Sequence, residues 1–208
     1  MSSEAFQTIV PCEQICESPS AWLLKDVLTD EECAHLIRLG QDKMKPSLTV
    51  DAETGEHIQV DSRTSSLTFL VLRADPIVAA IEEKISDLVN IPVENGEGLQ
   101  LLRYQIGQEY KPHFDAFDTK TPGGLKAAQK GGQRVATILL YLSDVEEGGE
   151  TIFPEVNLKV PARKRQGLLF YSLYDDGTVD PKSLHGGAPV IKGEKWVATK
   201  WLRERVYI

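Results

Sequence analysis

The second half of the chain consists of short apolar runs with no helical pattern between them. Four of these runs are bounded by glycine, proline or aspartate and cover residues 99–106, 134–142, 167–174 and 195–202. Apolar runs of this length, bounded by such turn-forming residues, are typical of β-strands. Strands that follow one another without intervening helices pair antiparallel, so the chain is predicted to form a β-sandwich or barrel.

Two helices are predicted upstream of these strands. Thr29 and Glu32 form the pattern of a capping box, in which each side chain accepts a hydrogen bond from the other residue's backbone amide. A second helix is predicted to begin at Asp75-Pro76, because proline at the first helical position needs no amide partner, and to end near Asn90. The predicted apolar stripes are Cys33, Leu36, Ile37 and Met44 in the first helix and Ile77, Val78, Ile81, Ile85 and Leu88 in the second.

Two long polar segments interrupt this order. Residues 45–62 and 119–133 show no apolar periodicity, and the second segment contains four glycines. Loops of this length in a small domain are usually disordered or functional. We expect them to act as lids over a site, with the glycines absorbing the backbone change on closure.

The charge balance excludes some classes of partner. The chain has 31 acidic and 23 basic residues, a formal charge of −8, whereas nucleic acid and anionic lipid both require clustered basic residues. No stretch approaches the roughly 20 apolar residues of a membrane-spanning helix, and residues 1–10 lack the apolar run of a signal peptide. We therefore expect a cytoplasmic protein with no nucleic-acid or membrane partner.

Three cysteines, Cys12, Cys16 and Cys33, lie in the first sixth of the chain. An odd number in so short a stretch predicts no disulfide framework and favours a reducing compartment. Cys12 and Cys16 could form half of a metal site, but no second pair of cysteine or histidine follows at a suitable spacing.

The four histidines are few enough to consider one by one. His35 falls on the first predicted helix and His57 in the first polar segment, and we interpret both as structural or solvated. His113 and Asp115 are separated by one residue, so on a strand their side chains point to the same face. His185 follows in the strand-rich half. Two imidazoles and a carboxylate on one face are the ligands of non-haem Fe(II) oxygenases, although a surface His-Asp pair and an unrelated loop histidine remain the simpler interpretation.

Lys195 begins an otherwise apolar predicted strand. A lysine that points inward there needs an anionic partner, because an unpaired buried ammonium is very costly. A dicarboxylate bound to a metal by one end would supply that partner at its other end.

Several longer motifs follow one another in the chain. They are 104–115 (YQIGQEYKPHFD), 134–137 (RVAT), 141–154 (YLSDVEEGGETIFP), 185–190 (HGGAPV), 193–196 (GEKW), Trp201 and, upstream, Arg63-Thr64-Ser65-Ser66. In type and order they closely resemble the prolyl 4-hydroxylase family of Fe(II)/2-oxoglutarate-dependent dioxygenases, over about residues 20–205. Asp115 is retained, which argues against the related halogenases, where a small residue stands at that position.

The resemblance implies a fold and a domain organisation. The fold class is α+β, mainly β, with a double-stranded β-helix (jelly-roll) core and N-terminal packing helices. It implies a single dioxygenase domain over residues 1–208, with helical N-terminal support at about 20–98 and the jelly-roll at about 99–208.

The resemblance also implies roles for individual residues. The implied Fe(II) ligands are His113, Asp115 and His185. The residues implied to bind the cosubstrate 2-oxoglutarate are Lys195, Tyr104, Thr151 and Trp201. Lys195 would pair with the far carboxylate, and Arg134 would reach into a peptide groove. Simpler interpretations are core aromatics for Tyr104 and Trp201, an ordinary strand threonine for Thr151 and a surface charge for Arg134.

The implied activity is hydroxylation of peptidyl proline at C4 with O2 and 2-oxoglutarate, releasing succinate and CO2, with ascorbate as a further cofactor. A proline-containing peptide or protein is the expected partner, since a proline-rich segment is already extended and loses little entropy on docking. The alternatives are a dioxygenase of the same mechanism that acts on another residue or on a free amino acid, and a non-catalytic jelly-roll that binds metal or peptide. A zinc hydrolase with two histidines and one carboxylate would leave Lys195 unexplained.

Overall fold

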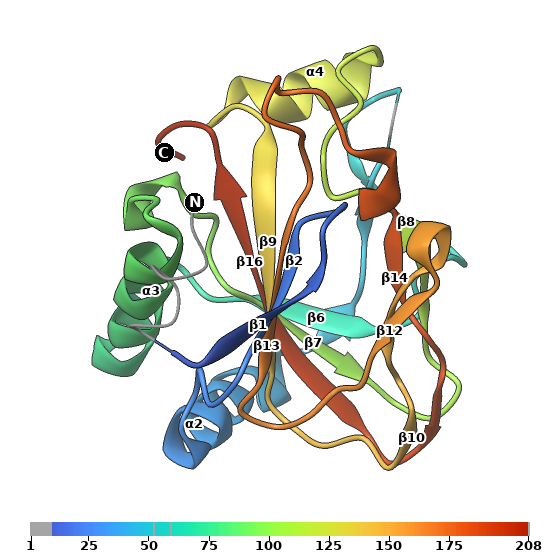
Figure 1. The fold of residues 1–208 in the computed structure, drawn as a ribbon. Helices are drawn as coiled ribbons and strands as arrows, with labels where there is room; N and C mark the ends of the chain where they lie inside the picture. The colour runs from blue at the N-terminus through green and yellow to red at the C-terminus, as the bar shows by residue number, and fades with distance from the viewer. Residues whose placement is uncertain (1–9, 52, 59, 208) are drawn as a thin grey trace.

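The computed structural model describes residues 10–51, 53–58 and 60–207. An eight-stranded antiparallel sheet, here called the main sheet, runs through the middle of the molecule (Figure 1). Its strand order is β1-β2-β13-β9-β16-β7-β6-β3. A four-stranded sheet, the minor sheet, has the order β12-β11-β14-β8. Two further strand pairs are β10-β15 and β4-β5.

The strand bounds agree closely with the four predicted runs. The strands of the main sheet are β1 (Cys12–Cys16), β2 (Ala21–Leu24), β13 (Gly167–Tyr171), β9 (Arg134–Tyr141), β16 (Lys195–Arg203), β7 (Gln100–Tyr104), β6 (Ser66–Phe69) and β3 (Lys45–Pro46). Those of the minor sheet are β12 (Leu158–Val160), β11 (Thr151–Phe153), β14 (His185–Gly187) and β8 (Tyr110–His113). The remaining pairs are β10 (Glu147–Gly148) with β15 (Val190–Lys192), and β4 (Thr49–Val50) with β5 (His57–Ile58).

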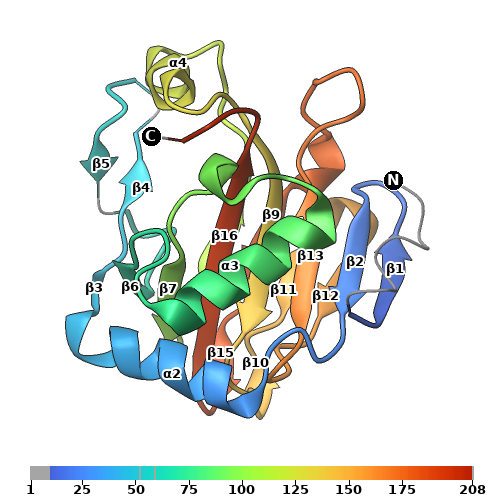
Figure 2. The same cartoon turned by 90° about the vertical axis from the view of Figure 1, so that its left-hand side faces the viewer.

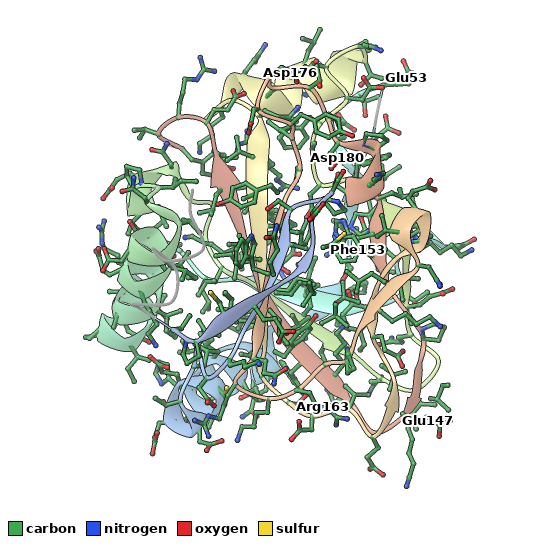
Figure 3. The ribbon with its side chains drawn as sticks, viewed as in Figure 1. Glu53, Glu147, Phe153, Arg163, Asp176 and Asp180 are labelled. Atoms are coloured by element: carbon green, nitrogen blue, oxygen red, sulfur yellow. The ribbon has the colours of Figure 1, made fainter. Side chains whose placement is uncertain are left out.

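Both faces of the main sheet are covered, which is why every residue of the central strand β16 is buried. The helices α2 (Asp30–Gly40) and α3 (Pro76–Val89) lie across one face (Figure 2). The other face packs on the minor sheet around Tyr141, Phe153 and Phe170. Phe153 lies in the interior, whereas Glu53, Glu147 and Asp176 lie at the periphery (Figure 3). This arrangement of two sheets confirms the expected jelly-roll with packing helices.

Both predicted helices are present, with the predicted caps. The Thr29 hydroxyl accepts from the Glu32 amide at 3.1 Å, and the Glu32 carboxylate accepts from the Thr29 amide at 2.7 Å. Asp75 caps α3 by accepting from the backbone amides of Ile77 and Val78, both at 2.9 Å. Asn90 ends the helix in the left-handed conformation, with φ of 54°.

The predicted apolar stripes need two corrections. Ile77 is exposed, because it lies in the first turn of α3 on the side that faces away from the sheet. Val78 and Ile81, on the side that faces the sheet, are buried. Met44 lies beyond α2, which ends at Gly40 and continues as a short 3₁₀ turn. The Met44 side chain still packs against the same core.

The polar segments and the N-terminal part contain more regular structure than predicted. Residues 45–62 include β3 and the β4-β5 hairpin, and residues 119–133 include a third helix, α4 (Pro122–Gln129). The region expected to be a helical support also contributes β2, β3 and β6 to the main sheet. The prediction that this region is helical was therefore only partly correct, because its strands are too short to show a clear alternation. Single 3₁₀ turns occur at η1 (Gln41–Lys43), η2 (Val93–Asn95), η3 (Pro154–Val156) and η4 (Pro181–Ser183).

The helices of the described ranges are all too short or too polar to cross a lipid bilayer. The signal-peptide prediction concerns residues 1–10, and all of these except Val10 lie outside the described residues. The side chain of His57, predicted to be structural or solvated, also lies outside the described part of the structure. The three cysteines are free thiols.

Candidate active site

The two predicted histidines meet through a strand pair in the minor sheet. β14 pairs with β8 so that His185 lies opposite His113, and the centres of the two rings are 4.5 Å apart. Asp115 lies two residues beyond the end of β8, not on the strand as predicted. Its carboxylate nevertheless faces both rings. His113 Nε2 lies 3.7 Å from Asp115 Oδ1, and His185 Nε2 lies 3.5 Å from Asp115 Oδ2.

Backbone carbonyls set the orientation of both imidazoles. The Nδ1 atom of His113 lies 2.9 Å from the Lys111 carbonyl oxygen, and that of His185 lies 2.9 Å from the Ser183 carbonyl oxygen. A carbonyl can only accept, so each Nδ1 carries the proton and each Nε2 presents a lone pair to the common point. One ligand atom from each of His113, Asp115 and His185 lies within 4.8 Å of the others. This donor set and its geometry fit a ferrous ion.

The protonation states of these groups also suit a metal. Burial by itself would raise the pKa of Asp115, but the charges of His185, His113 and Arg134 and a hydrogen bond from Thr137 bring it down to about 2. The Thr137 hydroxyl donates to Asp115 Oδ2 at 2.7 Å. Burial is the largest cause that lowers the pKa of His113, and the charge of the neighbouring His185 is the second. The pKa of His113 falls to about 3. At neutral pH the carboxylate is ionised and the His113 imidazole is neutral, which are the forms that bind metals.

Lys195 lies at the inner end of the same pocket, with only 3% of its surface exposed. It is opposite Tyr104 across β16 and β7, and its Nζ lies 5.3 Å from the centre of the Tyr104 ring and 5.8 Å from that of Tyr141. Burial lowers the pKa of Lys195 to about 8, partly offset by the charge of Glu150. A cation enclosed in this way is stabilised by a carboxylate that enters the pocket.

A glycine and two hydroxyl groups shape the space beside this lysine. Thr151 lies opposite Gly187 across β11 and β14, and its hydroxyl lies 2.8 Å from that of Tyr141. A Cβ on Gly187 would contact Lys195 Nζ at 3.8 Å and the Tyr104 ring at 3.9 Å. The absence of a side chain at Gly187 therefore leaves room for a small carboxylate ligand among these groups.

The pocket opens into a groove of about 840 Å³ on the surface of the molecule. The residues that line both cavities are Arg63, Gln100, Tyr110, His113, Asp115 and Trp201. The β4-β5 hairpin contributes to one wall of the groove, and the segment from β8 to the first turn of α4 contributes to the other. His113 and Asp115 thus lie where the smaller pocket meets the groove, and His185 lies in the smaller pocket beside them.

Arg134 lines the groove and is held firmly in its wall, and its predicted role in binding a peptide stays a prediction. Its guanidinium bonds both oxygens of Glu97, with Nε–Oε1 at 2.7 Å and NH2–Oε2 at 2.9 Å. It also lies 3.6 Å from the centre of the Trp201 ring. Glu97 accepts a further hydrogen bond from Arg203 at 2.9 Å. Arg134 therefore fixes Trp201 through a cation–π contact while its charge is shared with a carboxylate.

The structure brings together all eight site residues predicted from the sequence. Seven line the pocket, namely His113, Asp115, His185, Lys195, Tyr104, Thr151 and Trp201, and Arg134 lines the groove. The prediction missed the supporting roles of Thr137, Tyr141 and Glu97. Thr137 and Tyr141 lie four residues apart on one face of β9, in an otherwise apolar run, and both also suit ordinary interior positions. Only the register of β9 against its neighbours shows what they contact.

Comparisons with known proteins agree with this geometry. Residues 99–203 match the 2OG-Fe(II) oxygenase superfamily. Probable prolyl 4-hydroxylase 8 of Arabidopsis thaliana is 47% identical, over 94% of this chain and 72% of that protein. Prolyl 4-hydroxylase 5 of the same plant is 46% identical, over 91% of this chain and 70% of that protein. The chain belongs to the prolyl 4-hydroxylase family.

Solved structures of prolyl hydroxylases share the fold. The viral collagen prolyl hydroxylase of Paramecium bursaria Chlorella virus-1, in complex with 2-oxoglutarate, superposes with a TM-score of 0.71 at 28% identity, covering 91% of this chain and 98% of that chain. A prolyl hydroxylase of Trichoplax adhaerens, in complex with a peptide fragment, superposes with a TM-score of 0.63 at 15% identity, covering 90% and 85%, and so supports the fold alone. This prolyl 4-hydroxylase family member is an Fe(II)/2-oxoglutarate-dependent dioxygenase.

Proposed function

We propose that this enzyme hydroxylates peptidyl proline at C4, consuming O2 and 2-oxoglutarate and releasing succinate and CO2. The observation that carries the proposal is that His113, Asp115 and His185 bring their ligand atoms together in the pocket that contains Lys195, while His113 and Asp115 also line the open groove. A free amino acid needs no groove of about 840 Å³, whereas an extended peptide does. The relatives that carry the name prolyl 4-hydroxylase support proline as the target.

The residues of the pocket divide the binding tasks. His113 Nε2, His185 Nε2 and the Asp115 carboxylate would hold Fe(II), while the Lys195 ammonium would pair with the far carboxylate of 2-oxoglutarate. When bound, iron and 2-oxoglutarate supply an oxidation in which decarboxylation is coupled to insertion of one oxygen atom into a C–H bond. The part of the protein is to hold one C–H bond close to the iron and to keep water away.

The groove suits an extended peptide. A proline-rich segment in the polyproline II form has no internal hydrogen bonds and is already extended, so it loses little conformational entropy when it binds in an open groove. The acidic charge of the chain supports a protein partner over nucleic acid or a membrane surface.

The proposal is tested by incubating the enzyme with proline-containing peptides under Fe(II), 2-oxoglutarate, ascorbate and O2. We expect succinate release matched by the gain of one oxygen atom on proline, located at C4 by fragmentation mass spectrometry. His113→Ala should lose the coupled turnover. Hydroxylation of free proline or of lysine peptides, with proline peptides left unmodified, would contradict the proposal.

A further inference from the structure

The main sheet extends beyond the strands that carry the site, and the inner face of this extension is apolar and open. β6 pairs with β7 so that Phe69 lies opposite Gln100 and Leu67 lies opposite Leu102. Phe69, Leu67 and Leu48 line the groove. The Phe69 side chain is 50% exposed, whereas Gln100 and Leu102 are buried. Exposed apolar surface inside a groove is typical of a binding site.

Strand register connects Phe69 to the iron ligands. Gln100 of β7 pairs with Thr199 of β16, which in turn pairs with Leu139 of β9. Phe69, Gln100, Thr199 and Leu139 therefore form one row across four adjacent strands, which Figure 2 shows side by side. Leu139 is two residues from Thr137, the residue that holds Asp115, and so faces the same side of the sheet. The row starts at Leu139, near the residue that holds the carboxylate ligand, passes through the buried residues Gln100 and Thr199 and ends at the exposed Phe69.

The spacing of strands gives the length of this row. Neighbouring strands lie about 4.8 Å apart, so three spacings place Phe69 about 14 Å from β9. A peptide in the polyproline II form advances about 3.1 Å per residue. The distance therefore corresponds to about four or five residues of substrate.

We propose that Phe69, with Leu67 and Leu48, forms a subsite for an apolar side chain of the substrate, four or five residues from the proline that is hydroxylated. This inference rests on the proposed function and specifies its substrate. The subsite is continuous with the groove wall at Arg63 and Gln100, which also line the iron pocket.

The charges around the subsite favour an apolar substrate side chain over a basic one. Lys45 pairs with Leu67 across β3 and β6, so both side chains lie on the same face, and Lys45 also lines the groove. Of the four acidic residues that line the groove, Asp51 and Asp118 belong to the β4-β5 hairpin and to the segment before α4, Asp115 is an iron ligand, and Glu97 is paired with Arg134. A lysine of the substrate at this position would meet an apolar surface beside a like charge.

The test uses peptides that carry a single proline in an alanine and serine host, with one leucine moved stepwise along the peptide. We expect the KM for hydroxylation to fall about five- to tenfold when the leucine is four or five residues from the proline on one side, the range for partial burial of one side chain. Phe69→Ala should abolish this positional preference, and Phe69→Leu should retain it. Val71→Ala is the matched control, because Val71 is 75% exposed and does not line the groove.

The outcomes separate the two proposals. A wild-type KM that is the same for every leucine position, or a preference that survives in Phe69→Ala, would overturn the subsite alone. If no peptide gains oxygen while 2-oxoglutarate is still consumed, proline hydroxylation is overturned and the subsite with it. A lysine at the preferred position should raise the KM in wild type, and less so in Lys45→Gln.

Discussion

At the scale of single residues, the behaviour of Lys195 depends most on where the fold places it. In water its ammonium would stay charged to above pH 10. In the pocket, burial lowers its pKa to about 8, with Glu150 partly offsetting that effect. The affinity for the dianionic cosubstrate is therefore expected to depend on a group that titrates near pH 8.

This pKa predicts how 2-oxoglutarate binding changes with pH. Below about pH 8 Lys195 is charged and the Kd for 2-oxoglutarate should be constant. Above about pH 8 the amine loses its proton, so the Kd should increase with pH, with a slope that approaches about tenfold per pH unit. Asp115 and His113 do not titrate in this range, because their pKa values lie near 2 and 3.

The measurement is the Kd for 2-oxoglutarate with Mn(II) in place of Fe(II), by calorimetry from neutral to moderately alkaline pH. Lys195→Arg is the matched variant, because a guanidinium stays charged throughout this range and should give a flat profile. A wild-type Kd that does not change with pH would show that Lys195 is not the partner of the cosubstrate.

At the scale of elements, the helix α4 shows why the second polar segment escaped prediction. It begins Pro122-Gly123-Gly124, a sequence that favours a turn. Its first turn is capped by Thr121, whose hydroxyl accepts from the Gly124 amide at 3.1 Å. The rest of its stability comes from distant parts of the chain, which a local pattern does not contain. The predicted role of this segment as a lid remains a prediction.

Two basic side chains connect α4 to the rest of the molecule. Arg203, at the end of β16, donates to the carbonyl oxygens of Ala127 and Lys130 at the C-terminal end of the helix. Lys126 donates to the Thr54 carbonyl oxygen at 3.2 Å, which joins α4 to the β4-β5 hairpin on the other side of the groove. Figure 2 shows these two elements next to each other. A cation at the carbonyl end of a helix is favourable. Arg203 therefore stabilises α4 in addition to forming its ion pair with Glu97.

We expect Arg203→Met to loosen α4 without disturbing the metal site. Loss of hydrogen bonds worth about 1–3 kcal/mol should speed amide hydrogen exchange in the helix by about ten- to a hundredfold. Hydrogen-exchange mass spectrometry measures this, and Mn(II) affinity should stay within about twofold. Arg205→Met is the control, since that exposed side chain leaves its backbone bond to Gly131 intact. Equal exchange rates in the two variants would contradict the role of Arg203.

At the scale of the whole molecule, an ion pair joins the helical layer to the main sheet. Lys200 of β16 and Glu82 of α3 are 1% and 0% exposed, with Nζ and Oε1 only 2.6 Å apart. Glu82 also accepts from the backbone amide of Arg73 at 2.7 Å. Burial lowers the pKa of Lys200, but its contact with Glu82 opposes that shift. We expect this pair to specify how the two layers fit together more than it stabilises them, because the cost of removing both charges from water offsets most of their attraction.

Removing one partner should therefore cost more than removing both charges. Lys200→Met leaves a buried carboxylate without its cation and should lower the free energy of unfolding by about 3–5 kcal/mol. The double variant Lys200→Met with Glu82→Gln should recover most of this loss, because glutamine can still accept from Arg73. Urea denaturation of the parent, the two single variants and the double variant measures the coupling. Strictly additive losses would show that the two charges do not interact.

The sequence by itself determined the features that depend on a few neighbouring residues. The capping pairs at Thr29 and Asp75 were correct because their hydrogen bonds span only two or three residues. The predictions of the long strands β9 and β16 were correct because short apolar runs that are bounded by turn residues and follow one another without a helical pattern favour strands. The candidate site residues were named through the resemblance of their motifs to a known family.

Only the tertiary structure decided how those residues meet. Asp115 faces the histidines from outside a strand because Thr137, on another sheet, donates to its carboxylate. Phe69 became a candidate subsite only through the register of β6, β7, β16 and β9. The physical reason is that strand pairing and buried charge pairs join residues far apart in the chain. Their energies therefore leave no periodic trace in the local sequence.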